Sequence, residues 1–133
     1  MNGIKVRAYS KAKDGNTQLT KNFKVREFAC NDGTDVIFIS HDLVVVLQKI
    51  RDHFGKPVII NSAYRTPAKN KQVGGATYSQ HLYGTAADIT ISGVSPEAVA
   101  EFAETLLPKT GGIGIYKTFT HVDVRAVRSR WNG

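Results

Sequence analysis

The stretch "SQHLYGTAADI", residues 79–89, places a histidine and an aspartate seven positions apart among small side chains. Imidazole nitrogens and carboxylate oxygens can bind a metal ion or carry a proton. The segment is not a regular amphipathic helix, because Gly84 weakens a helix and the apolar residues keep no helical period. We therefore expect a loop that carries His81 and then enters a buried strand that carries Asp88.

The segment "THVDV", residues 120–124, brings the same two side-chain types together a second time. On a strand, residues two apart face the same side, so His121 and Asp123 are predicted to be neighbours. A hydrolytic zinc site takes three protein ligands, usually histidine with an acidic residue, and keeps one position open. The chain offers few ways to supply such a set, and His81 and His121 are the histidines set among small or strand-forming residues.

The position of Asp88 adds a physical argument for a nearby cation. It lies between Ala87 and Ile89, where burying an unpaired carboxylate is costly. A metal ion would offset that cost, and so would a positively charged side chain. From the residues alone, two simpler interpretations stay open: Asp88 pairs with an arginine, and His121 is a hydrogen-bonded core histidine.

The composition is that of an ordinary globular domain, with 133 residues of which 41% are hydrophobic and 22% are charged. This length predicts a single domain, residues 1–133, with a core of its own. The single cysteine excludes an internal disulfide framework and a multi-cysteine zinc cluster. We expect this residue, Cys30, to be a small buried side chain.

The net charge of +7 is concentrated at the start of the chain. Residues 1–26 hold seven Lys or Arg against one acid, Asp14. We predict that residues 1–22 form a basic N-terminal arm or an edge strand, which either aids solubility or binds a polyanion such as nucleic acid or an anionic cell wall. Specific nucleic-acid binding is disfavoured, because no helix-turn-helix or RNA-binding signature is present.

The chain has no apolar run of the ~18 residues that a membrane span requires. Its start also lacks the apolar region of a secretory signal. We therefore expect no membrane insertion, synthesis in the cytoplasm, and a monomer.

Periodicity and capping residues predict an α+β fold, with a small antiparallel sheet and helices packed on one face. The clearest helix is predicted over residues 40–54, with Ser40 as N-cap and Gly55 at its end. A second helix over 95–108 has Ser95 as N-cap and Pro96 in its first turn. The other predicted elements are a strand at 4–10, a turn at 11–18, a helical turn at 22–29, a buried strand at 57–65, a helical turn and loop at 66–79, a strand at 86–92 and a hairpin at 111–125.

Three of these segments resemble one protein family. "SQHLYGTAADI" matches the S-x-H-x-x-G-x-A-x-D-I pattern of the M15 zinc peptidases, the D-alanyl-D-alanine carboxypeptidase family. "GIGIYKTFTHVDVR" is similar to their C-terminal H-x-D segment, and "INSAYRTPAKNKQVGGA" is similar to their S-x-Y-R-T-P arginine motif. The resemblance covers about residues 23–125 and implies the fold of the Hedgehog and DD-peptidase domains.

The resemblance also implies a site. His81, Asp88 and His121 would be the zinc ligands. Arg65 would grip a carboxylate of the substrate, a task suited to its planar pair of donors, and Ser79 would contact the same end of the substrate.

One position departs from the family pattern. Many members carry an acidic general base three residues before the last histidine ligand, and this chain has Thr118 there. A peptidase of this type needs a group that takes a proton from the attacking water. Asp123 is the remaining candidate for that catalytic role, and it could equally orient His121 through the other ring nitrogen.

The function that the resemblance implies is a zinc metallopeptidase acting on peptidoglycan stem peptides, near D-amino acids, as a carboxypeptidase or an endopeptidase. Such a protein would act on the cell wall, as a lysin of a phage or mobile element does. The alternative is a non-catalytic zinc-binding domain of the same fold that binds cell-wall peptides or a protein partner. Thr118 favours the alternative, whereas the intact Arg65 motif favours the peptidase.

Overall fold

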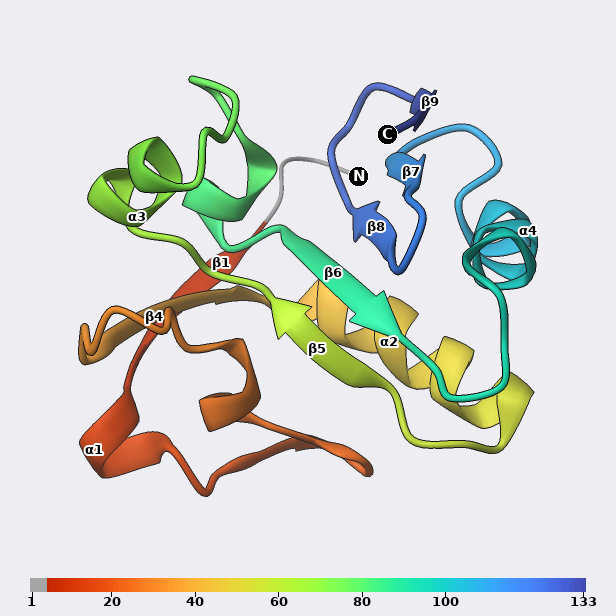
Figure 1. Ribbon diagram of the computed structural model, residues 1–133. Helices are drawn as coiled ribbons and strands as arrows, with labels where there is room; N and C mark the ends of the chain where they lie inside the picture. The colour runs from red at the N-terminus through yellow and green to blue at the C-terminus, as the bar shows by residue number, and fades with distance from the viewer. Residues whose placement is uncertain (1–4) are drawn as a thin grey trace.

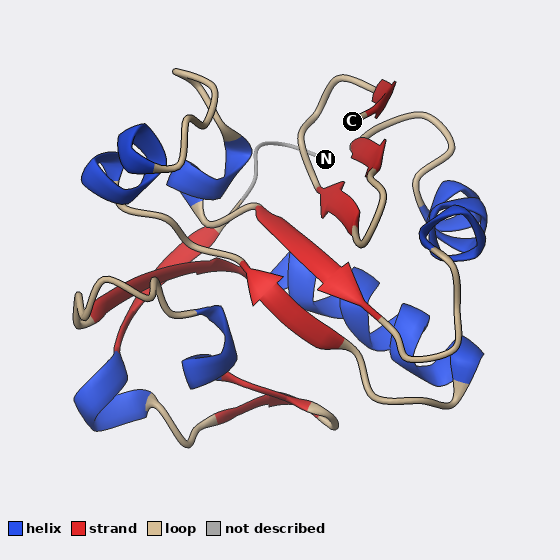
Figure 2. Cartoon of the chain, viewed as in Figure 1, coloured by secondary structure: helices blue, strands red, loops and turns tan. Residues whose placement is uncertain are grey.

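A computed structural model describes residues 5–133 and contains three β-sheets with four helices and two 3-10 turns. The largest sheet has five strands in the order β5-β6-β8-β7-β9, and it carries the residues discussed below (Figures 1 and 2). Its strands are antiparallel except for the parallel pair β7 and β9. Their bounds are β5 Ile59–Ser62, β6 Ala86–Thr90, β7 Gly112–Ile115, β8 Thr120–Asp123 and β9 Ser129–Asn132.

Two long helices pack against this sheet and close the core. Helix α2, His41–Phe54, has Ser40 as its N-cap and ends at Gly55, as the sequence predicts. Helix α4, Pro96–Leu106, begins after Ser95 and contacts β7, β8 and α2. Figure 1 shows α2 behind β5 and β6 and α4 beside β7. The α+β class is therefore confirmed.

The N-terminal part of the chain folds against α2 as two small sheets. Strand β1, Val6–Ser10, pairs with β4, Val36–Ser40, and β2, Gln18–Thr20, pairs with β3, Phe23–Lys24. The predicted helical turn is the 3-10 turn η1, Val25–Phe28, which buries Val25 and Phe28, while Phe23 is buried from β3 just before it. Cys30 is also buried, as expected.

Several predicted elements differ from the structure. The turn expected at 11–18 contains a short helix, α1, Lys11–Asp14, because the Ser10 hydroxyl accepts a hydrogen bond from the Lys13 amide at its start. The buried strand expected at 57–65 is the shorter β5, which lies at the edge of the sheet and leaves Ile59 55% exposed. The sheet is mixed rather than purely antiparallel, since β9 was not predicted and joins it in parallel.

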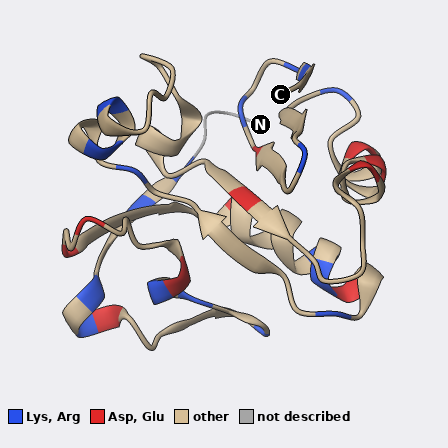
Figure 3. Ribbon diagram, viewed as in Figure 1, with Lys and Arg blue, Asp and Glu red and all other residues tan. Residues whose placement is uncertain are grey.

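Basic residues lie on both sides of the fold. Figure 3 colours Lys and Arg blue on the ribbon of α1 and in the C-terminal segment around β8 and β9, whereas α4 carries the red of acidic residues. In residues 5–133, no helix combines the length and the apolar character that crossing a bilayer demands.

One tight backbone contact joins β4 to the segment that carries His81. That segment runs from α3, Pro67–Gln72, through a loop to the 3-10 turn η2, Gln80–Tyr83, which ends at Gly84. Gly84 has a positive φ of 73°, and its carbonyl accepts a hydrogen bond from the Ser40 amide at 2.9 Å. A Cβ at Gly84 would overlap the backbone carbonyl of Phe38. Only glycine therefore satisfies both the turn and the contact.

Replacing Gly84 by alanine is expected to cost more stability than the same change at Gly55, which caps α2 with nearly the same φ and ψ but has open space around it. Gly55→Ala should lose about 1–2 kcal/mol for the left-handed conformation alone. Gly84→Ala should lose a further ~1–3 kcal/mol for the overlap. Urea unfolding of both variants measures the difference, and equal losses would contradict the close contact.

Candidate metal centre

Three side chains that the sequence singled out converge at one point of the large sheet. Asp88 on β6 and His121 on β8 are directly paired residues of neighbouring strands, and His81 reaches them from η2. One ligand atom from each of the three lies within 4.8 Å of the other two, and all three residues are buried. The structure therefore brings together the loop histidine, the strand aspartate and the hairpin histidine.

The hydrogen bonds of His81 fix the nitrogen that faces Asp88. Its Nδ1 lies 2.7 Å from the carbonyl oxygen of Ala63, so this nitrogen must carry the proton and donate it. The other nitrogen, Nε2, lies 3.2 Å from Asp88 Oδ1. In the neutral imidazole, two acceptors thus face each other, and only a cation or an additional proton between them makes this arrangement favourable.

His121 presents its nitrogens in a matching way. Its Nε2 donates to Asp123 Oδ2 at 2.7 Å, and its Nδ1 lies 3.0 Å from Asp88 Oδ1. Burial opposes the charged imidazolium, but the hydrogen bonds to Asp123 and Asp88 outweigh it and raise the pKa of His121. Burial likewise opposes ionisation of Asp88, yet its bonds to His121 and His81 hold the pKa of that carboxyl well below its usual value. The space between Asp88 and the two histidines is therefore suited to a positively charged group.

The donor set fits a zinc ion. Two imidazole nitrogens and one carboxylate oxygen are the ligands that zinc takes in catalytic sites, where a fourth position stays open. Here the Nε2 of His81, the Nδ1 of His121 and the carboxylate of Asp88 would hold the ion. Each histidine donates its other N–H to a fixed oxygen, which sets the ring orientation for metal binding.

Asp123 lies on the far side of the His121 ring from Asp88, and its carboxylate is fully occupied. Oδ1 accepts from the Gly112 amide and from the backbone and side chain of Arg125, while Oδ2 accepts from His121 and Arg125. The side chain is 0% exposed. Burial opposes its ionisation, but the bonds from His121 and Arg125 keep the pKa of Asp123 well below its usual value. Of the two predicted roles, the geometry favours orienting His121 over acting as a base.

Arg65 lies beside the cluster and keeps part of its guanidinium free. Its Nη1 donates to Asn70 Oδ1 at 2.9 Å and its Nη2 to Ser62 Oγ at 3.5 Å. The same Nη2 forms an ion pair with Asp88 Oδ2 at 3.8 Å. Two other acids that could have paired with it, Asp32 and Asp35, accept hydrogen bonds from Thr66 and Ser10 instead. The guanidinium is thus positioned by Asn70 and Ser62, and Asp88, which also faces both histidines, is its acidic partner.

A cavity of about 570 Å³ opens above the cluster. Arg65 and Ser79 lie in its lining, and the Ser79 hydroxyl also accepts a hydrogen bond from the His81 amide at 3.2 Å. Thr118 is exposed in the turn between β7 and β8 and does not line the cavity. Among the cavity-lining residues of the described range 5–133, Asp88 is the one acid.

Sequence reasoning missed several residues that complete the site. Arg125 is two residues after Asp123, so an extended chain places both on one side, and this spacing could have indicated the pair. The sequence gave no comparable signal for Asn70, because its contact with Arg65 forms only once residues 67–72 fold as helix α3. Two of the aromatic residues of the cavity, Tyr116 and Trp131, also gave none, since they meet only when β9 joins the sheet.

Comparison with known proteins places the chain in a family. Residues 17–123 match the family described as Peptidase M15. The chain therefore belongs to the M15 peptidases. It is also similar to the zinc D-Ala-D-Ala carboxypeptidase of Streptomyces albus G, with 46% identity over 44 residues. That match covers 32% of this chain and 17% of the relative's length.

The ligand assignment predicts one zinc per chain in the wild type. His81→Ala and His121→Ala should each lower zinc affinity by more than the ~10–100-fold that loss of an outer hydrogen-bond partner costs. His53→Ala serves as the control, because His53 is an exposed residue of α2. Elemental analysis after dialysis against limiting zinc measures the difference. Full retention of zinc by both site variants would contradict the assignment.

Proposed function

We propose that this protein is a zinc metallopeptidase that hydrolyses peptide bonds near D-amino acids in peptidoglycan stem peptides. The observation that carries the proposal is the convergence of His81 Nε2, Asp88 and His121 Nδ1 at the base of a cavity that is also lined by Arg65. Membership of the M15 peptidases supports the reaction class. The order of motifs further supports a single domain of the Hedgehog and DD-peptidase fold.

Zinc bound by these residues would supply Lewis-acid activation of a water molecule and of the scissile carbonyl. The protein side chains orient the ligand atoms. His81 and His121 present one nitrogen each because Ala63 and Asp123 accept hydrogen bonds from their other nitrogens. Asp88 would balance part of the charge of the ion from inside the sheet, where water competes little.

Arg65 is proposed to bind a carboxylate of the peptide. Its planar fork offers two parallel N–H donors, and Asn70 holds the fork in place at the cavity wall. Ser79 lines the same cavity, and we propose that it contacts the same end of the substrate. The substrate class rests on the name of the relative, which acts on D-Ala-D-Ala, and on the arginine in the cavity wall, whose charge suits a terminal carboxylate.

Asp123 is proposed as a positioning residue rather than as the general base. A base must reach the attacking water within hydrogen-bond distance or through one further water. The oxygens of Asp123 instead accept bonds from His121, Gly112 and Arg125 on the far side of the ring. The proton would then pass to a solvent water or to the substrate's own carboxylate.

A second candidate function is a non-catalytic zinc domain that binds cell-wall peptides or a protein partner. The exposed position of Thr118 favours it, since the usual acid is replaced and no second carboxylate lines the cavity within residues 5–133. Turnover of stem peptides by the zinc-loaded protein separates the two functions. Binding of the peptide without release of D-alanine or cleavage would select the second.

Arg65→Lys is expected to retain zinc and fold while kcat/KM on stem peptides falls by at least about tenfold. A lysine keeps the charge but loses the bidentate geometry. The loss should appear mainly in KM if the carboxylate is held equally in the ground and transition states. Lys71→Arg, a change at an exposed position of α3, is the control. Unchanged kinetics for Arg65→Lys would show that Arg65 does not hold the substrate.

Asp123→Asn tests the positioning role of that residue. Loss of an outer partner should weaken zinc binding by ~10–100-fold, and excess zinc should restore most of the turnover. A general base would behave differently, with tight zinc and turnover lowered by ~10²-fold or more at any zinc concentration. Zinc titration and turnover measured on one preparation distinguish these outcomes.

A further inference from the structure

The last ten residues lie beyond the segment that matches the family, which ends at residue 123, yet they form part of the cavity wall. Strand β9 adds to the sheet in parallel with β7 and places Trp131 opposite Gly114. Trp131 is the single tryptophan of the chain and lines the cavity above the ligand cluster. The C-terminal strand therefore supplies a large aromatic side chain to the site.

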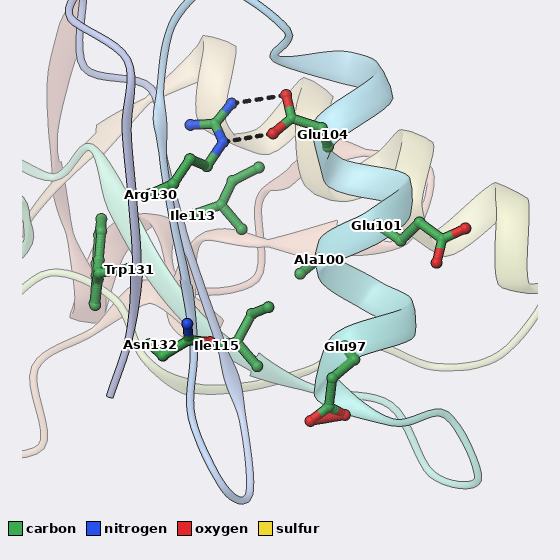
Figure 4. A pocket seen from close by; sticks show the side chains of 9 residues that line it. All are labelled: Glu97, Ala100, Glu101, Glu104, Ile113, Ile115, Arg130, Trp131 and Asn132. Carbon is green, nitrogen blue, oxygen red and sulfur yellow. Dashed lines mark hydrogen bonds and ion pairs between the residues drawn. The ribbon is translucent and has the colours of Figure 1, made fainter.

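Strand β9 is held firmly against α4 by its arginine. Arg130 donates from Nε and Nη2 to the two carboxylate oxygens of Glu104, at 2.7 and 3.1 Å, and from Nη1 to the Gly111 carbonyl at 2.7 Å (Figure 4). Successive residues of a strand face opposite sides. Figure 4 shows Trp131 on the side of β9 away from Glu104. The pairing of Arg130 with α4 thus directs the indole toward the cavity.

The indole of Trp131 packs closely on all the elements around it. A Cβ at Gly114 would come within 2.5 Å of the indole ring, so glycine is needed at that position. The ring centroid lies 5.0 Å from that of His121, and the Arg125 guanidinium lies 5.3 Å from the indole. These contacts hold the indole in the orientation seen here, beside His121.

In that orientation Trp131 fixes the hydroxyl of Tyr116. The indole Nε1–H donates to Tyr116 Oη at 2.9 Å, and the Tyr116 ring stacks on Phe119 with centroids 4.4 Å apart. A phenol oxygen can accept one such bond and still donate its own proton. Within residues 5–133, no acceptor takes that proton, and Tyr116 lines the cavity. The hydroxyl is therefore an oriented donor beside the ligand cluster.

We propose that Tyr116 binds a backbone carbonyl oxygen of the peptide substrate and that Trp131 is a positioning residue acting through it. The inference rests on the proposed function, in which Arg65 binds the carboxylate of the same peptide. Arg65 and Tyr116 come from different parts of the chain, β5–α3 and β7–β8, and line one cavity with the ligand cluster between their strands. A peptide held at its carboxylate and at a carbonyl has its intervening amide placed over that cluster.

The test compares Tyr116→Phe, Trp131→Phe and the double variant, all zinc-loaded, on an N-acetylated tripeptide ending in D-Ala-D-Ala. Tyr116→Phe should raise KM by about 3- to 10-fold, the usual loss for one hydrogen bond, with kcat and zinc content little changed. Trp131→Phe should raise KM in the same direction. The double variant should be no worse than the more affected single variant, because both changes remove one interaction. Tyr9→Phe, in β1, is the control.

The outcomes separate this inference from the proposed function. If the wild type binds the tripeptide without cleaving it, calorimetric Kd values replace KM and the same pattern is expected. Unchanged KM or Kd in Tyr116→Phe would overturn the inference alone. Independent, multiplying losses in the double variant would overturn the role of Trp131. A wild type that neither binds nor cleaves the tripeptide would overturn the proposed function and this inference with it.

Discussion

A buried carboxylate that requires a positive charge is the constraint on which the rest of the site depends. Asp88 lies on the second strand of the five-stranded sheet, with an imidazole nitrogen of His81 and one of His121 against the same oxygen. Such a group is costly to bury unless a cation or bound proton compensates it. The surrounding structure also fixes the direction from which a compensating cation can be bound. Each histidine has its other nitrogen committed to a fixed acceptor, so only one nitrogen per ring faces the centre.

The fold brings these groups together through a few specific contacts. The pairing of β6 with β8 puts Asp88 opposite His121, and the turn at Gly84 returns η2 to the start of β6. Behind His121, the carboxylate of Asp123 is fixed by Arg125, so the ring is oriented from the protein side. This chain of contacts runs from the sheet interior to the cavity, and it explains why the acid after the last histidine is buried rather than open to substrate.

Much of this arrangement was predictable from local patterns. The caps Ser40 and Ser95 and the apolar periodicity located both long helices, and the two-residue spacing predicted that His121 and Asp123 would be neighbours. Long-range pairing was not predictable in the same way. Strand β9, "SRWN", has no alternation of apolar and polar residues, and it becomes a strand only because Gly112–Ile115 offers a free edge. The exposed edge position of β5 depends likewise on the strand order and not on its own sequence.

The central claim is that the three converging groups hold zinc through defined nitrogens. Anomalous diffraction at the zinc absorption edge, from crystals of the zinc-loaded protein, tests it most directly. The account predicts one zinc per chain, bound by His81 Nε2, the Asp88 carboxylate and His121 Nδ1, with His121 Nε2 still bonded to Asp123. A zinc peak elsewhere in the chain, or coordination through the Nε2 of His121, would contradict it.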